Sequence, residues 1–525
     1  MKKSLWEVAL ICLLTGAFAH AAEPADEQVI ASIKMEGFQN SQLMDTAFYL
    51  TEVFSPRLSG SPGLKAAAEW SRARLAEWGL ENAHLESWDL AFPGWHLESY
   101  SAELLEPRYL RLAAIPMAWT PGTAGVLEGV PVLVKIKKEE DFEKYRGKLS
   151  GSIVLNDAVE ALDPEKASAA RRLSDKKIRE FVGAMVPGKP ADYWEESDEW
   201  YEELKQFAQV IRFFKEEGVA ALLVPSSRER GVVRVTYSGI EKPEENAPTF
   251  VVARESFNML ARLVDGGFKP RLRLESRVEI LGGVKGHNVI AEIPGSDPKL
   301  RDELVIIGGH IDAWHAGTGA TDNAAGCAVA MEAMRILTAI GAKPRRTIRV
   351  ALWDGEEVDY GGSVHHVERH FADLESMELR PDHGKLSAYY NYDSGTGKIR
   401  GIHLQGNEWV RPIFEAFLAP FHYLGADTVT TENTDGTDHM IFDAVGLPAF
   451  TFIQDPMDYT QMTHHTNQDV YDQLAEEDLK QSAVIVASFA YHTAMRDEIL
   501  PRKELPPKKE RDRDTGDASP DAVGP

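Results

Sequence analysis

Short apolar runs alternate with amphipathic stretches in the second half of the chain. Residues from Asn323 to Ile340 repeat apolar positions at helical spacing, whereas the shorter runs are apolar at consecutive positions. Strands that are apolar on both faces and are separated by helices are typical of a parallel or mixed sheet. We therefore expect an α/β domain here. The runs predicted to be strands are His287–Ile293, Leu304–Gly308, Thr347–Trp353, Leu386–Tyr392 and Pro448–Ile453.

The first half of the chain has a different pattern. Helical spacing recurs in Ser41–Val53 and Ala66–Trp78, and after residue 119 short β runs flank a charged helical stretch from Pro164 to Gly218. This change of pattern predicts an inserted domain. The expected divisions are a leader at 1–21, an N-terminal part of the main domain at 22–118, an inserted domain at 119–270, the main α/β domain at 271–500 and a disordered tail at 501–525.

The N-terminus is typical of a secretory signal peptide. Met-Lys-Lys precedes an apolar run from Val8 to Ala19, and a small-x-small sequence ends at Ala21. The run is too short to span a bilayer, and we expect no other membrane anchor. Cleavage after Ala21 would leave one cysteine, Cys327, which cannot form an internal disulfide. We therefore expect an exported protein, either periplasmic or secreted.

The composition is that of an ordinary globular protein, with 43% hydrophobic and 26% charged residues. The 82 acidic residues outnumber the 57 basic residues, which gives a formal net charge of −25. Binding of nucleic acid needs a basic face, so we expect no partner of this class.

Residue types that bind metal ions follow several of the predicted strands. Chemistry in open α/β sheets gathers beyond the carboxyl ends of the strands, so we expect these residues to lie together. Imidazole and carboxylate are ligands suited to zinc, and a carboxylate can bridge two ions. The stretches read GGHIDAWHAGTGATDNAAG, WDGEEVDYGG, NYDSGTG, TDGTDHM and MTHHTNQD, and they hold His310, Asp312, Asp322, Glu356, Glu357, Asp393 and His465.

Some of these residues also have a plain structural interpretation. Asp322 stands at the start of a predicted helix, where an aspartate often caps the helix. Alternation along a strand would put Asp312 beside His310, where it could orient the imidazole. The pair Glu356-Glu357 is harder to explain without a cation or a catalytic role, because adjacent carboxylates at a strand end repel each other.

Together, these motifs resemble metallopeptidase family twenty-eight, the zinc-dependent exopeptidases, and most closely its carboxypeptidase Q (plasma glutamate carboxypeptidase) branch. The resemblance covers Gly286 to about Asp497. It implies a three-layer α/β peptidase domain around a mixed, largely parallel sheet. Residues Gly147–Leu155 are similar to a protease-associated domain, which many members carry as a β-rich insertion. The matching motifs are His310-Ile311-Asp312, Asp322-Asn323, Glu356-Glu357, Asp393 and His465-Thr466.

The resemblance also implies roles for these residues and a cofactor of two Zn²⁺ ions per chain. Asp322 would bridge the ions, His310 and Asp393 would complete one site, and Glu357 and His465 would complete the other. Glu356 would be the general base that takes a proton from the attacking water and returns it to the leaving amine. The expected substrates are short peptides.

Two positions depart from the family pattern. Asp359 stands where members usually have glycine, and it could alter the turn or add negative charge near the substrate. His464 stands where many members have a tyrosine that steadies the developing oxyanion, and we expect His464 to donate this hydrogen bond.

Other functions stay open at this stage. A related peptidase family that includes aminoacylase has a similar ligand order, but it places its extra domain between the glutamate pair and the last histidine. A glutaminyl-cyclase-like transferase with one zinc shares the fold, and a metal-free peptidase-like ectodomain would be a binding protein. The sequence does not show which end of a peptide is cut, and a homodimer, which occurs in this branch, cannot be read from it.

Overall fold

The structure, a computed structural model, describes residues 26–160, 162, 171–188, 193–237, 239–240 and 242–506. The predicted signal peptide and the predicted tail beyond residue 506 lie outside these ranges, so both stay predictions. Among the helices that are described, none is long and apolar enough to cross a membrane.

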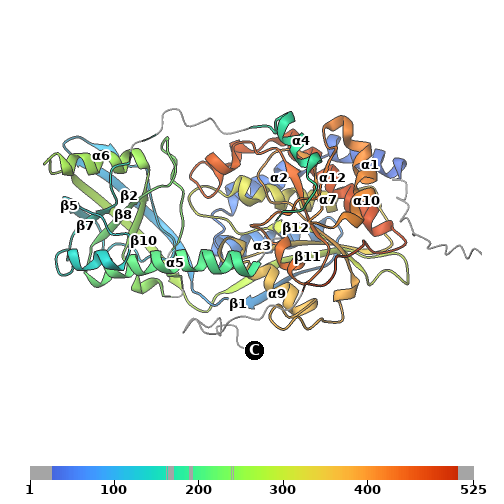
Figure 1. The fold of residues 1–525 in the computed structure, drawn as a ribbon, viewed down its shortest axis with the longest axis horizontal. Coiled ribbons are helices and arrows are strands. Elements are labelled where there is room, and N and C mark those ends of the chain that lie inside the picture. The colour runs from blue at the N-terminus through green and yellow to red at the C-terminus, as the bar shows by residue number, and fades with distance from the viewer. Residues whose placement is uncertain are drawn as a thin grey trace, which may run out of the picture.

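An eight-stranded mixed sheet forms the centre of the larger unit, on the right of Figure 1. Four neighbouring strands, β13-β12-β14-β17, run parallel, while β1 and β11 pair antiparallel with their neighbours. β15 pairs antiparallel with β17 and parallel with β16. The predicted α/β fold with a mixed, largely parallel sheet is confirmed. In spatial order the strands are β1 (Glu81–Asp89), β11 (Lys285–Ile293), β13 (Thr347–Trp353), β12 (Leu304–His310), β14 (Leu386–Asn391), β17 (Ala449–Gln454), β15 (Ile399–His403) and β16 (Thr428–Thr430).

Helices cover both faces of this sheet. One face packs on the larger apolar core, and the other on a smaller core around Trp353 and Phe442. Every residue of β12 and β14 is buried, which is why their sequences are apolar at consecutive positions. The first face carries α1 (Glu27–Gln39), α2 (Leu43–Phe48), α3 (Pro62–Glu77), α7 (Ala325–Ala339), α10 (Arg411–Leu418) and α12 (Glu476–Met495), and the second carries α9 (Gly361–His370) and α11 (His439–Ala444).

A second unit, on the left of Figure 1, contains two smaller sheets. Its helices are α5 (Tyr193–Glu216) and α6 (Arg254–Asp265), whereas α4 (Asp175–Gly183) lies on the larger unit. One sheet has the order β3 (Leu110–Arg111), β2 (Gly94–Glu106), β10 (Arg271–Leu281) and β5 (Leu127–Gly129). The other has the order β4 (Ala114–Pro116), β9 (Thr249–Val252), β8 (Ala221–Pro225), β7 (Ile153–Asn156) and β6 (Val132–Val134).

Strand pairing in this unit crosses both predicted domain boundaries. β10 pairs with β2 along its whole length and also pairs with β5, so residues on either side of 118/119 and 270/271 share one sheet. The carboxyl-terminal half of α5 packs into the core of the unit, where Ile211, Phe213 and Phe214 are buried. Segment 171–188, with α4, reaches the larger unit, where Phe181 contacts the ring of His403.

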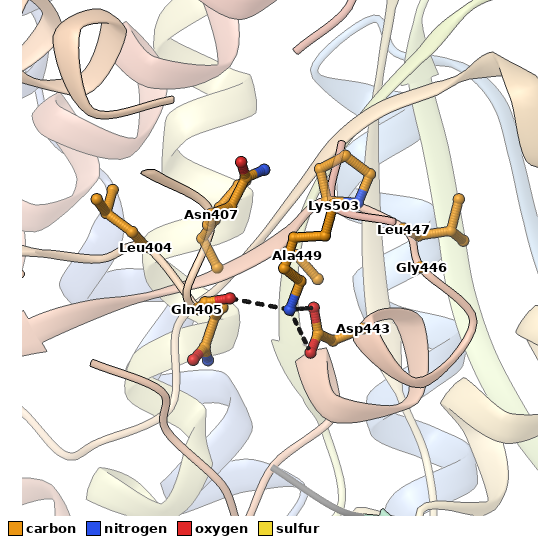
Figure 2. Close-up of a pocket in the computed structure, with 10 residues that line it drawn as sticks. Leu404, Gln405, Asn407, Asp443, Gly446, Leu447, Ala449 and Lys503 are labelled. Carbon is orange, nitrogen blue, oxygen red and sulfur yellow. Dashed lines mark hydrogen bonds and ion pairs between the residues drawn. The ribbon is translucent and has the colours of Figure 1, made fainter. Parts of the chain in front are cut away.

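The C-terminal segment is tied to the larger unit by Lys503 (Figure 2). Its Nζ donates to the carbonyl oxygen of Gln405 at 2.8 Å and lies 2.6 and 2.9 Å from the two carboxylate oxygens of Asp443. The pocket that these side chains line includes none of the predicted site residues, so we assign it to the anchoring of the chain end.

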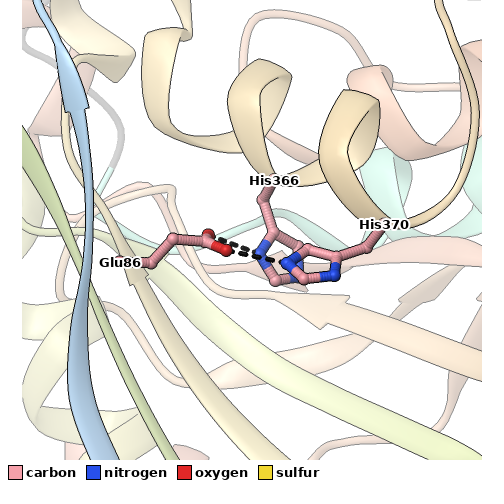
Figure 3. Close-up of side chains that lie close together, drawn as sticks. All are labelled: Glu86, His366 and His370. Atoms are coloured by element: carbon pink, nitrogen blue, oxygen red, sulfur yellow. Dashed lines mark hydrogen bonds and ion pairs between the residues drawn. The ribbon is translucent and has the colours of Figure 1, made fainter.

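A buried carboxylate joins the edge of the large sheet to helix α9 (Figure 3). Glu86 on β1 lies 2.7 Å from Nδ1 of His366 and 2.7 Å from Nε2 of His370, one turn further along the helix. Burial raises the pKa of Glu86, but the hydrogen bonds from both imidazoles outweigh it and hold that pKa well below its usual range. Burial lowers the pKa of His366 to about 4, so this imidazole is neutral and donates from Nδ1.

Replacing Glu86 by glutamine should weaken this contact. We expect Glu86→Gln to lower the free energy of unfolding at pH 7 by about 2 kcal/mol, because one buried imidazole loses its acceptor. The pKa of Glu86 is lower in the folded than in the unfolded chain, so its stabilising effect is full above about pH 4.5 and is lost as the pH falls further. Urea titrations at pH 7 and pH 3.5 should show a smaller difference between wild type and variant at the lower pH.

The matched control is Glu81→Gln, because Glu81 lies on the same strand but is exposed. The control should have the stability of the wild type at both pH values. Equal losses for Glu81→Gln and Glu86→Gln would contradict the inference that Glu86 holds β1 to α9.

Candidate metal centre

The predicted site residues meet at one edge of the large sheet. Strands β13, β12 and β14 are parallel neighbours, so their carboxyl ends lie side by side. His310 ends β12, Asp393 follows β14, and Glu356 and Glu357 follow β13. Gly355 turns the chain from β13 into α8 (Glu356–Asp359) with a φ of 87°, a conformation that glycine adopts without strain. The structure therefore brings together residues that are up to 83 positions apart along these strands.

The first cluster forms around the imidazole of His310, which is buried. Nε2 of His310 lies 3.3 Å from Oδ1 of Asp322 and 3.3 Å from Oδ1 of Asp393. Two ligand atoms that are each about 2.1 Å from one tetrahedral zinc ion lie about 3.4 Å from each other. Both distances from His310 therefore fit ligands of one shared ion.

The second cluster uses the other oxygen of the same aspartate. Nε2 of His465 lies 3.4 Å from Oδ2 of Asp322 and 2.8 Å from Oε2 of Glu357. Asp322 thus presents Oδ1 to His310 and Oδ2 to His465. A carboxylate that faces two ligand clusters with its two oxygens has the arrangement needed to bridge two ions.

Unsatisfied oxygens give a second test of the fit. Oδ2 of Asp322 and Oε1 of Glu357 are buried, and neither makes a hydrogen bond within the described part of the chain. Buried carboxylate oxygens without a partner carry a large desolvation cost, which a bound cation removes. The residues present therefore fit zinc in both the type and the spacing of their donor atoms.

The plain capping role for Asp322 is not observed. Helix α7 begins after Ala324, whose backbone occupies the capping position, and the amide of Gly326 donates to Oδ1 of Asn323 instead. The backbone N–H of Asp322 donates to Oδ2 of Asp469 at 3.3 Å. The side chain of Asp322 is therefore free of the helix and faces the two histidines.

Burial and mutual repulsion dominate the electrostatics of this edge. Burial raises the pKa of Glu356 and Glu357 well above their usual range, and the charges of Asp393 and Asp322 respectively raise them further. Burial lowers the pKa of His310, but the charges of Asp393 and Glu356 outweigh it and raise that pKa well above its usual value. The imidazole of His310 is therefore surrounded by carboxylates.

Asp312 contacts both the first histidine and the glutamate pair. Nδ1 of His310 lies 3.1 Å from the backbone oxygen of Asp312 and 3.4 Å from its Oδ1. The carboxylate accepts hydrogen bonds from the amides of Glu356 and Glu357 and from the hydroxyl of Ser59. The structure therefore places Asp312 behind His310, as expected, and adds a contact with the turn that carries both glutamates.

His464 lies at the rim of the second cluster. Its Nε2 is 4.0 Å from Oδ2 of Asp322, and its ring centroid is 3.8 Å from that of His465. The ring of Tyr459 is 5.1 Å away on the same loop. His464 therefore lies beside the second cluster, next to Asp322 and His465.

Asp359 is the other position that departs from the family pattern. Asp359 is exposed, and its Oδ1 accepts a hydrogen bond from the amide of Gly361 at 3.0 Å. Tyr360 between them has a φ of 58°. Asp359 thus stabilises the turn between α8 and α9, which is the first of the two roles considered for it.

Comparison with known proteins adds a family to this geometry. The model of peptidase family M28 matches residues 288–490, which hold every residue of both clusters. That part of the chain belongs to peptidase family M28. The family membership predicted from the motifs is therefore confirmed.

The similarity to individual proteins extends over most of the chain. Carboxypeptidase Q from Mus musculus is 26% identical over 481 residues, which are 90% of this chain and 90% of that protein. The structure of a peptidase M28 precursor from Shewanella amazonensis has a TM-score of 0.65, with 24% identity over 92% of this chain and 99% of that one. A zinc aminopeptidase from Bacillus subtilis has a TM-score of 0.55, with 18% identity over 87% and 95% of the two chains.

Several residues of the M28 site were not anticipated from sequence. Arg57 is fully buried, and its guanidinium donates to the backbone oxygens of Ile311, Thr318 and Gly319, so it holds the loop between the first histidine and Asp322. No motif marks Arg57, because its partners are backbone atoms, and all but Leu50 lie more than 250 positions away.

Two buried aspartates complete the surroundings. Asp469 accepts hydrogen bonds from the amide and hydroxyl of Thr321, and burial raises its pKa to about 7. Burial also raises the pKa of Asp438 to about 8. Asp438 belongs to the segment TDGTDHM, in which the sequence assigned no residue a role. The charge of Asp438 raises the pKa of Glu356.

Removal of the shared carboxylate should abolish binding of zinc at both clusters. We expect Asp322→Asn, which keeps the size of the side chain, to retain less than about a tenth of the zinc of the wild type, since an amide is a much poorer zinc ligand than a carboxylate. Zinc would be measured by elemental analysis after gel filtration. The exposed Asp435 on the loop before Asp438 offers a control, and Asp435→Asn should bind as much zinc as the wild type. Full zinc content in Asp322→Asn would contradict the shared role.

Proposed function

We propose that this chain is an exported exopeptidase that hydrolyses short peptides with two zinc ions. The proposal rests on the carboxylate of Asp322, whose two oxygens face two different clusters. One cluster contains His310 and Asp393, and the other contains His465 and Glu357. Family M28 supplies the peptidase function. Carboxypeptidase Q and the zinc aminopeptidase are both exopeptidases by name, and this supports the same class of reaction here.

Zinc, when bound, supplies a Lewis acid that polarises the scissile carbonyl and makes the attacking water more acidic. The residues around it supply the proton transfers. Of the two site glutamates, Glu357 contacts a histidine of the second cluster and Glu356 does not. A carboxylate oxygen of Glu356, a ring nitrogen of His310 and a carboxylate oxygen of Asp393 all lie within 4.8 Å of one another. We assign to Glu356 the transfer of a proton from water to the leaving amine.

The backbone contacts of Glu356 support this assignment. The two carboxylate oxygens of Asp312 accept hydrogen bonds from the amides of Glu356 and Glu357. One buried side chain therefore fixes the backbone position of both glutamates. Neighbouring residues on a short helix point in different directions. One glutamate can therefore act as a ligand while the other faces the reacting atoms.

Substitution of the base should separate zinc binding from catalysis. We expect Glu356→Gln to keep at least about half of the zinc of the wild type and to lose about 10³-fold in kcat, because the amide keeps the shape of the carboxylate but cannot accept the proton. The wild type should contain close to two zinc ions per chain. Activity would be measured with protein that begins at Ala22. The substrates are aminoacyl-anilides, free dipeptides and dipeptides blocked at either end, so that the block that is tolerated identifies the end that is cut.

The exposed Glu378 gives the matched control, and Glu378→Gln should keep full activity. A wild type that binds no zinc and hydrolyses no substrate would overturn the proposal and favour a metal-free binding ectodomain. One zinc ion per chain with cyclisation of N-terminal glutamine would instead favour the glutaminyl-cyclase-like transferase.

His464 should contribute to turnover more than to substrate binding. We expect His464→Ala to lower kcat by about 10²-fold with little change in zinc content, because a donor to the developing oxyanion acts mainly in the transition state. His464→Gln, whose amide can still donate, should recover part of the loss. The comparison requires kcat and KM of each variant on one good dipeptide. An unchanged kcat in His464→Ala would show that His464 has no such role.

A further inference from the structure

Another group of metal-ligand residue types lies away from the metal centre, at the β1 edge of the large sheet. Glu86 on β1 and His366 and His370 on α9 offer ligand atoms that all lie within 4.8 Å of one another (Figure 3). None of these three residues belongs to the clusters around Asp322. Two imidazoles and one carboxylate form a donor set that binds zinc in proteins.

Helix α9 presents both histidines to β1 because they are four positions apart. Residues at this spacing lie one turn apart on the same face of an α-helix, and histidine pairs at this spacing bind zinc in some enzymes. The ring centroids of His366 and His370 are 4.6 Å apart. Oε2 of Glu86 lies 2.7 Å from Nδ1 of His366, and Oε1 lies 2.7 Å from Nε2 of His370. The carboxylate therefore faces both rings at once.

The distances in this group resemble those in the metal centre. Two ligand atoms of one tetrahedral zinc ion lie about 3.4 Å apart, so an ion here requires Glu86 and each ring to separate by about 0.7 Å. The same small separation is needed in the second cluster, where Nε2 of His465 lies 2.8 Å from Oε2 of Glu357. The short contacts of Glu86 are therefore compatible with a site that opens when the ion enters.

Glu86 is buried without a permanently charged partner. In the part of the chain that the structure describes, no lysine or arginine pairs with it, and its further contact is the amide of Asn288, which donates to Oε2 at 3.3 Å. The buried carboxylate of Glu332 on α7, by contrast, pairs with Arg335 at 2.8 Å. A buried carboxylate that faces imidazoles has the surroundings of a metal ligand more than those of a structural ion pair.

His370 gives an ion access to this group. Its side chain is 31% exposed, whereas those of Glu86 and His366 are 5% and 1% exposed. A water molecule can complete the coordination on the exposed side. Binding moves the proton of His366 from Nδ1 to Nε2, which is buried and makes no hydrogen bond within the described residues. Because an unpaired buried donor is costly, we expect weaker binding here than at the metal centre.

The position of α9 suggests what an ion there does for the protein. The helix follows directly on the turn that carries Glu356 and Glu357. The loop of His465, on the other side of the metal centre, is held by an antiparallel bridge between Arg234 and Thr466. An ion between β1 and α9 would fix the helix that follows the glutamate turn, and so stabilise the fold without taking part in the reaction.

We propose that Glu86, His366 and His370 form a third zinc site, which is separate from the two clusters and of lower affinity. The ion replaces the two hydrogen bonds of Glu86 and joins β1 to α9. This proposal goes beyond the function proposed above, because it holds whether or not the chain hydrolyses peptides. The site fills when zinc is added in excess and empties during gel filtration, so the zinc content after that step stays close to two ions per chain.

Titration of Asp322→Asn with zinc isolates this site, because that variant is expected to lose zinc from both clusters. The protein must carry no histidine tag. We expect calorimetry to give about one zinc ion per chain. Saturating zinc should raise the melting temperature by at least about 3 °C, because the ion binds the folded chain.

A second substitution in the Asp322→Asn background tests the ligands. His370→Ala removes the most exposed ligand and should weaken zinc binding at least about tenfold, since loss of a group that merely supports a ligand already has an effect of this size. Glu86→Gln should weaken binding to a similar extent. His84→Ala is the matched control, because His84 is an exposed histidine on the same strand, and it should bind zinc like its parent. Melting temperatures without zinc show that each variant is folded.

Two results would overturn the third site. Equal zinc affinity in the His370→Ala and His84→Ala proteins would leave Glu86 as a hydrogen-bonded contact between β1 and α9. Crystals of the wild type soaked in zinc should also show an anomalous scattering peak between Glu86, His366 and His370, and its absence would have the same meaning. Neither result bears on hydrolysis, whereas a wild type without zinc at the clusters and without activity would contradict the proposed function and leave the third site intact.

Discussion

Repulsion between buried carboxylates is the constraint on which the rest of the site depends. Asp322, Glu357 and Asp393 are brought to one sheet edge around His310, and burial raises the pKa of the glutamates there. Such an arrangement is unfavourable unless a cation neutralises it. The strand ends, the turn at Gly355 and the loop of His465 all converge on the same place. We therefore regard bound zinc as part of the folded state of this edge.

A polar frame holds the carboxylates in place before any ion arrives. Asp312 fixes the glutamate turn through two amides, Asp469 fixes Thr321 beside the bridging aspartate, and Arg57 fixes the loop between them through backbone oxygens. Each of these groups is buried. Because the frame is rigid, a mutation in it should displace ligands without removing one, and its effect on zinc affinity should be smaller than that of losing a ligand.

The sequence predicted that the candidate ligands lie close together, because several of them follow apolar strands. The runs at 304–308, 347–353 and 386–392 all form parallel strands of the large sheet, and their carboxyl ends meet as expected. The role of Asp322 stayed ambiguous, because capping and metal binding use the same residue type at the same point. The hydrogen bond from the amide of Gly326 to Asn323 distinguishes the two roles, because it shows that Asp322 does not cap the helix.

Other features depended on contacts that no local pattern records. The pairing of β10 with β2 crosses the predicted domain boundaries, since a long antiparallel pair can join segments that are distant in sequence. Arg57 acts on backbone atoms, so its partners leave no trace as charged or apolar residues. Nothing in the sequence joins Glu86 to His366 and His370 until the fold places β1 beside α9.

The bridge between Arg234 and Thr466 also couples the two units thermodynamically. One backbone pairing holds the turn of the second unit and the loop of a zinc ligand, so any shift between the units changes the position of His465. Linkage requires the converse as well, so that an ion held by His465 biases the orientation of the second unit. The affinity for zinc would then depend on the orientation of the second unit relative to the larger one.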